Sequence, residues 1–81
     1  MKEMNAIKKL ENIGAIVAVK GNQVTGYIKN YLVELTVQHE DREVMIIRVR
    51  RANDIDDSMT DYSAGSFFDN LSQALRFVEG R

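Results

Sequence analysis

The segment from Tyr31 to Arg51, YLVELTVQHEDREVMIIRVRR, decides the fold of this chain of 81 residues. In Tyr31–Gln38, apolar side chains alternate with more polar ones, and β-branched residues are frequent. Val44–Arg51 shows the same period of two. This pattern is typical of strands with one buried face. Charged residues join the two runs, so the segment predicts an antiparallel hairpin.

The hairpin register follows from the side-chain pattern, because a shift of one residue moves every side chain to the other face. Glu34 opposite Arg48 gives an opposite-charge pair on one face of the sheet. The loop then falls at Glu40-Asp41-Arg42, without the glycine that three-residue loops usually contain. The apolar pairs predicted on the other face are Val33 with Val49, Leu35 with Ile47, and Val37 with Met45.

The face that carries Glu34 is more apolar than a solvated sheet face should be. One interpretation is that a helix or a loop of the same chain covers it. The other is that it binds a protein partner, either a second copy or another chain. The predicted partner-binding residues are Leu32, Val44, Ile46, Arg48 and Arg50.

A helix and two further strands are predicted before this hairpin. Lys2–Ile13 has Met4, Ile7 and Leu10 at helical spacing, and Gly14 is a natural C-terminal stop. The strands Ala15–Lys20 and Val24–Lys29 flank Gly21-Asn22, which suits a tight hairpin turn. Gly26 indicates a bulge or a close backbone approach, and Lys29-Asn30 a bend.

The C-terminal part predicts a short extended piece, Ser66-Phe67-Phe68, and a helix over Leu71–Glu79. Asn70 and Gln73 have the spacing of a capping box, and Gly80 ends the helix. The predicted fold is therefore one α+β domain: a helix, a four-stranded, mainly antiparallel sheet of two consecutive hairpins, and a helix, with both helices largely on one face. The predicted core is Met4, Ile7, Leu10, Val33, Leu35, Val37, Met45, Ile47, Val49, Leu71, Leu75 and Val78.

Composition restricts the functional classes. The formal net charge of −1 does not favour a generally basic nucleic-acid or membrane-surface binder. The chain has no cysteine, so disulfides and thiolate metal sites are excluded, which fits a reducing cytoplasm. The first residues, MKEMNAIKKLE, lack the apolar core of a signal peptide, and no segment has the length of a membrane-spanning helix. We therefore expect a cytoplasmic protein.

The sequence contains no recognisable catalytic constellation, and we expect a protein that is not an enzyme. Asp54, Asp56 and Ser58 match the first ligand offsets of a calcium loop, but Met59 and Gly65 stand where the turn glycine and the bidentate glutamate are needed. A solvated acidic loop is the preferred interpretation. The only histidine, His39, lies in the predicted hairpin loop. We predict no metal, cofactor or small-molecule ligand.

Nucleic-acid binding is the alternative function. Arginines beside aromatic side chains on a sheet bind single strands in several proteins. The candidate residues are Arg48, Arg50, Arg51 and Lys29. The element order also resembles a double-stranded RNA-binding domain. However, the second helix begins with Asp69-Asn70-Leu71-Ser72 instead of the basic residues of that family, so the resemblance implies only a fold.

Overall fold

The computed structural model describes residues 1–51 and 65–80. The elements are α1 (Glu3–Asn12), β1 (Ile16–Lys20), β2 (Gln23–Ile28), β3 (Tyr31–Val37), β4 (Val44–Arg51), β5 (Ser66–Phe68) and α2 (Leu71–Val78). The five strands form one antiparallel sheet in the order of the chain. The predicted α+β fold is confirmed, and the extended piece before α2 adds a fifth strand.

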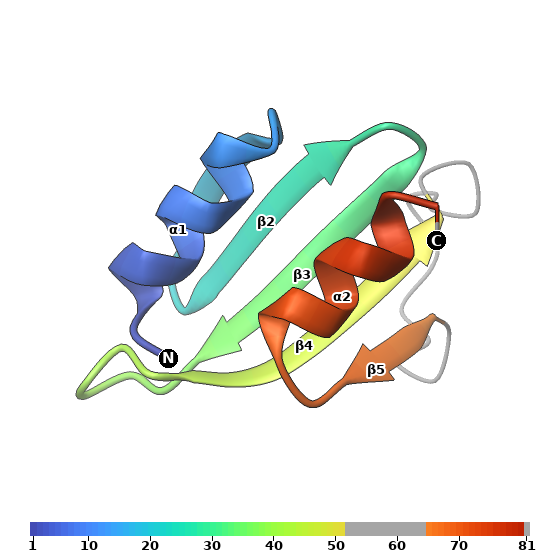
Figure 1. The fold of residues 1–81 in the computed structure, drawn as a ribbon. Coiled ribbons are helices and arrows are strands. Elements are labelled where there is room, and N and C mark those ends of the chain that lie inside the picture. The colour runs from blue at the N-terminus through green and yellow to red at the C-terminus, as the bar shows by residue number, and fades with distance from the viewer. Residues whose placement is uncertain (52–64, 81) are drawn as a thin grey trace, which may run out of the picture.

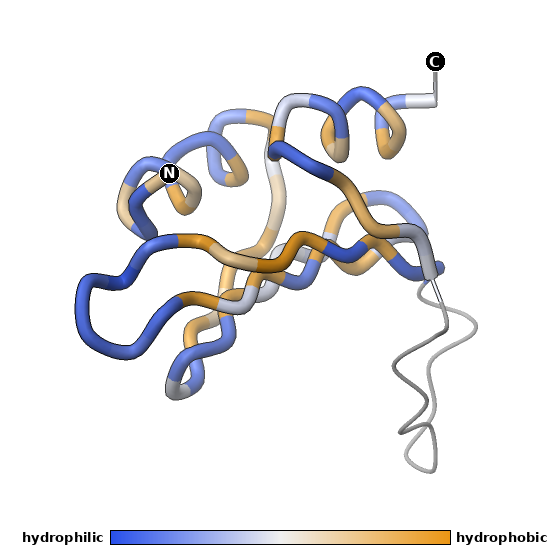
Figure 2. Tube along the Cα trace, turned by 90° about the horizontal axis from the view of Figure 1, so that it is seen from below, coloured by the Kyte–Doolittle hydropathy of each residue, from blue (hydrophilic) through white to orange (hydrophobic). Residues whose placement is uncertain are grey.

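Both helices lie on the same face of the sheet (Figures 1 and 2). α1 packs against β1 and β2, and α2 packs against β4 and β5. We call the opposite side of the sheet the open face, because neither described helix covers it. The molecule is therefore a two-layer structure in the described residues, as predicted.

The core lies between the helices and one set of alternating strand residues. Leu10 of α1 and Leu35 of β3 are fully buried. The buried apolar residues are Ala6, Leu10, Ala15, Val24, Val33, Leu35, Val37, Ile47, Val49, Leu71, Ala74 and Val78. The predicted Ile7 and Leu75 pack against this core and are partly buried. The core thus joins residues of both helices to residues of β2, β3 and β4.

Two predicted core residues, Met4 and Met45, are both 63% exposed, so this part of the prediction is wrong. On α1 the buried residues are Ala6 and Leu10, because the Leu10 side chain packs directly against Gly26 of β2. A Cβ at Gly26 would lie 3.0 Å from Leu10 Cδ2. The close approach predicted for Gly26 is therefore confirmed, and it rotates α1 so that Met4 faces away from the core.

A β-bulge corrects the predicted register at the tip of the central hairpin. The pairs Val33–Val49, Leu35–Ile47 and Glu34–Arg48 are as predicted, but the register shifts after Thr36 and Val37 pairs with Val44 instead of Met45. The bulge places the extra residue, Met45, outside the ladder. The predicted loop Glu40-Asp41-Arg42 becomes a four-residue loop over 39–42. Arg42 adopts a φ of 56° in it, and its N–H donates to the carbonyl of Gln38.

The other strand connections are tight turns. Gly21-Asn22 is a two-residue loop with a positive φ only at Gly21, the pattern of a type II′ turn, so the predicted hairpin is confirmed. Lys29-Asn30 also joins directly paired strands, since Ile28 pairs with Tyr31. It is therefore a hairpin turn and not the predicted bend.

The helix ends follow the sequence signals. Gly14 follows the C-cap of α1 with a φ of 90°. Asn70 Oδ1 accepts a hydrogen bond of 2.9 Å from the N–H of Gln73, and Gly80 follows α2 with a φ of 86°. The predicted acidic loop, with Asp54, Asp56 and Ser58, lies outside the described residues. No described helix has the length and apolarity needed to cross a membrane.

Candidate functional site

The open face is the candidate site, and alternation along the strands decides which side chains it carries. Leu32, Ile46, Arg48 and Arg50 of the predicted partner surface lie on it. Leu32 pairs with Arg50, Glu34 with Arg48 and Thr36 with Ile46, and these β3 residues alternate with the buried residues of the same strand. Val44 does not. The bulge pairs it with Val37, and it packs against the core, so its predicted position on the open face is wrong.

Glu34 is the centre of the polar part of the open face. Its Oε1 accepts a hydrogen bond of 2.8 Å from Arg48 Nε and lies 2.7 Å from Arg48 Nη2. Its Oε2 accepts a hydrogen bond of 2.8 Å from Arg50 Nη2. All three side chains are about nine-tenths buried. The two arginines are therefore structural ion-pair partners, and their charge is largely engaged inside the protein.

A hollow of about 550 Å³ opens beside this ion pair. Its apolar walls include Ile46, 46% exposed, and Phe67 of β5, 57% exposed. The Arg48 guanidinium lies 6.0 Å from the centre of the Phe67 ring, within reach of a cation–π interaction. The polar residues that line the hollow are Asn22, Gln23, Glu34, Thr36 and Arg48. The hollow thus combines exposed apolar walls with hydrogen-bonding groups.

Gln23 Oε1 is buried at this hollow and has no hydrogen-bond partner among residues 1–51 and 65–80. Arg50 Nε is also buried without a hydrogen-bond partner among the described residues, but Arg50 does not line the hollow. A buried polar atom without a partner costs about 1–3 kcal/mol. Such atoms beside a hollow are the positions that a bound molecule would satisfy.

The four cations of the predicted nucleic-acid surface do not lie together. Arg48 and Arg50 are on the open face, whereas Arg51 pairs with Tyr31 and alternates to the helix side. Lys29, Asn30, Tyr31 and Arg51 line a separate, smaller hollow of about 240 Å³. Lys29 and Arg51 are both exposed. The sheet therefore divides the predicted surface into two pairs of cations.

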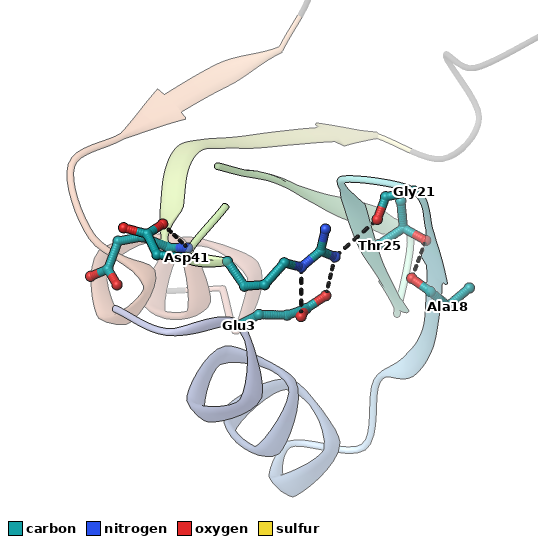
Figure 3. A network of polar contacts seen from close by, with 7 residues as sticks. Glu3, Ala18, Gly21, Thr25 and Asp41 are labelled. Carbon is teal, nitrogen blue, oxygen red and sulfur yellow. Dashed lines mark hydrogen bonds and ion pairs between the residues drawn. The ribbon is translucent and has the colours of Figure 1, made fainter. Parts of the chain in front are cut away.

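A second polar cluster ties the start of the chain to two hairpin loops (Figure 3). Arg42 Nη2 donates to the carbonyl of Gly21 at 2.9 Å and to Glu3 Oε2 at 2.6 Å. Hydrogen bonds from Arg42, opposed by partial burial, hold the pKa of Glu3 below its ordinary value. The same hydrogen bond raises the pKa of Arg42. The cluster joins α1 to both loops, a structural role.

Phe67, Gln23 and Thr36 line the hollow but were not among the predicted site residues. The sequence carries a signal for Phe67, because Phe67 and Phe68 alternate and only one of them can face the core. Phe68 packs against the core, which leaves Phe67 on the open face. Gln23 and Thr36 carry no comparable signal, since their role depends on the pairing of β2 with β3.

In residues 1–51 and 65–80, no three histidine, aspartate or glutamate side chains are grouped to hold a metal ion. His39 is exposed in the hairpin loop, as predicted. Comparison of the chain with protein-family models, curated proteins and solved structures gives no match.

Proposed function

We propose that the chain is a non-enzymatic binding module that binds a protein partner through the open face of its sheet. One observation carries the proposal: Ile46 and Phe67 are exposed apolar walls of a hollow of about 550 Å³. Exposed apolar groups beside polar ones are typical of protein interaction surfaces. The partner-binding residues are Ile46, Phe67, Leu32 and the Glu34–Arg48–Arg50 group beneath them.

The lining of the hollow suggests the chemistry of the partner segment. An apolar side chain would fill the space between Ile46 and Phe67, and an N–H or O–H of the same segment would donate to Gln23 Oε1. The carboxylate of Glu34 already accepts hydrogen bonds from two arginines. It is therefore poorly placed to act as a general base, which supports binding over catalysis.

Comparative affinity purification with variant proteins tests this function. Ile46→Glu places a charge in the hollow, and Met4→Glu places the same charge on an exposed site of α1 as the matched control. We expect a specific partner to be retained by the wild type and by Met4→Glu, and lost from Ile46→Glu with its circular dichroism unchanged. If no retained protein depends on Ile46, the open face is not the interface.

Nucleic-acid binding is the second candidate, and the observation that favours it is the corner with exposed Lys29, Arg51 and the Tyr31 ring. Arg48 and Arg50 support it less, because Glu34 neutralises part of their charge. Fluorescence anisotropy with labelled single- and double-stranded oligonucleotides tests it. Binding that weakens with salt and is lost in Lys29→Glu and Arg51→Glu supports this candidate. An unchanged affinity in these variants removes it.

A further inference from the structure

β1 is an edge strand with a largely apolar sequence, IVAVK. In the described part of the sheet, its only strand neighbour is β2. Ile16 is 73% exposed and Val19 is 52% exposed, although Val19 pairs with the buried Val24 and so lies on the helix side. Protected edges usually carry a proline, a bulge or central charges. β1 has only Lys20, at its end.

The β1–β2 hairpin determines which backbone groups of β1 face outwards. The two-residue loop is closed by Lys20 and Gln23, the pair that is hydrogen-bonded in such hairpins. Hydrogen-bonded pairs alternate along an antiparallel ladder, so Ala18–Thr25 is the next one. The N–H and C=O groups of Val17 and Val19 therefore point away from β2, towards solvent.

We propose that β1 pairs with β1 of a second copy, antiparallel, about a two-fold axis at Ala18. Because the axis passes through Ala18, Val17 of each copy lies opposite Val19 of the other copy. This gives two symmetric Val–Val pairs. Both pairs can exchange their two outward backbone hydrogen bonds. Each exposed Val19 side chain then meets a β-branched neighbour on the helix side, a favourable cross-strand pair.

Other features favour a second copy as the occupant of this edge. In the proposed register Lys20 lies opposite Ile16, so the two copies do not oppose like charges. α1 contacts both β1 and β2, so this pairing places the two α1 helices on the same face of one continuous sheet (Figure 1).

The mass of the protein in solution is the first test, measured by sedimentation equilibrium at increasing concentration. We expect a dimer whose dissociation constant rises by about tenfold or more in Val19→Lys, because the charge enters the strand interface. Ile46→Glu is the matched control, and its dimer mass should remain unchanged. This result separates the dimer from the partner surface proposed above. A monomer at every concentration, or a Val19→Lys dimer of unchanged affinity, would overturn the proposal.

Disulfide formation between introduced cysteines tests the register. No natural cysteine competes, because the sequence contains none. Across the axis the two Ala18 residues form a pair without hydrogen bonds, with Cα atoms about 4.5 Å apart, which a disulfide can span. We expect Ala18→Cys to form a covalent dimer rapidly under diamide, and Lys20→Cys to form little. Equal yields from the two variants would exclude this register.

Discussion

Arg42 and Glu3, 39 residues apart in the chain, form a bidentate ion pair between the central hairpin loop and the start of α1. Arg42 Nε donates to Glu3 Oε1 at 3.0 Å and Nη2 donates to Oε2 at 2.6 Å. A backbone hydrogen bond joins the same two residues, because the N–H of Glu3 donates to the carbonyl of Arg42 at 2.9 Å. This contact fixes the end of α1 against the hairpin, and its energy depends on pH.

The first prediction concerns acid. Hydrogen bonds from Arg42 lower the pKa of Glu3 below its ordinary value, so the folded protein binds this proton less readily than the unfolded chain. The ion pair therefore stabilises the fold fully above the ordinary pKa, and the contribution is lost as the pH falls through the lowered pKa. We expect Glu3→Gln to lower the free energy of unfolding near neutral pH and to differ less from the wild type in acid.

Urea unfolding of both proteins across a pH series measures this difference. Glu11→Gln is the control, because Glu11 is exposed on the same helix. A constant difference between Glu3→Gln and the wild type at all pH values would contradict the proposed ion-pair contribution.

The second prediction concerns the contact between Leu10 and Gly26. A methyl group at Gly26 would approach both Leu10 Cδ atoms to within 3.1 Å, and Leu10 is fully buried and cannot move aside freely. We expect Gly26→Ala to cost about 1–3 kcal/mol and Leu10→Ala about 2–5 kcal/mol. The double variant should lose less stability than the sum of the two single losses. The reason is that Leu10→Ala removes the side chain that the new methyl group would contact, and the methyl group fills part of the space that Leu10→Ala leaves. Additive losses in urea unfolding would show that the two sites are independent.

The third prediction concerns the start of α2. Asn70 Oδ1 satisfies the N–H of Gln73 at 2.9 Å, so Asn70→Ala should lower the free energy of unfolding by about 1 kcal/mol. Asn70→Asp keeps an acceptor at this site and should stay close to the wild type. Thermal unfolding followed by circular dichroism compares the three proteins. An Asp variant as unstable as the Ala variant would show that the cap is not the cause.

The fourth prediction concerns Glu34, which neutralises two largely buried arginines. Glu34→Gln leaves both guanidinium groups beside an uncharged amide, and breaking a buried ion pair costs about 3–5 kcal/mol. Glu40→Gln, in the exposed hairpin loop, should change the free energy of unfolding little. Denaturant unfolding measures both. A small loss in Glu34→Gln would mean that the arginines are solvated in the folded protein and are more available for a ligand.

Local patterns in the sequence determined the elements of this protein. Alternation in Tyr31–Gln38 and Val44–Arg51 predicted the two central strands and the pairs Val33–Val49 and Leu35–Ile47, because a half-buried strand requires a period of two. Gly14 and Asn70 marked helix ends through backbone conformation and capping, which act within a few residues. The two-residue turn at Gly21-Asn22 is local in the same way.

Only the tertiary structure decided how these elements meet. The bulge that exposes Met45 and turns Val44 to the core arises where the hairpin loop must also meet Glu3 at the start of α1. The rotation of α1 that exposes Met4 depends on the space at Gly26, in another strand. The hollow beside Ile46 needs Phe67, which reaches it only when β5 pairs with β4. The sequence by itself therefore determined the strands, turns and caps, since these depend on nearby residues. Packing between distant segments decided the register at the hairpin tip, the buried face of α1 and the composition of the open face.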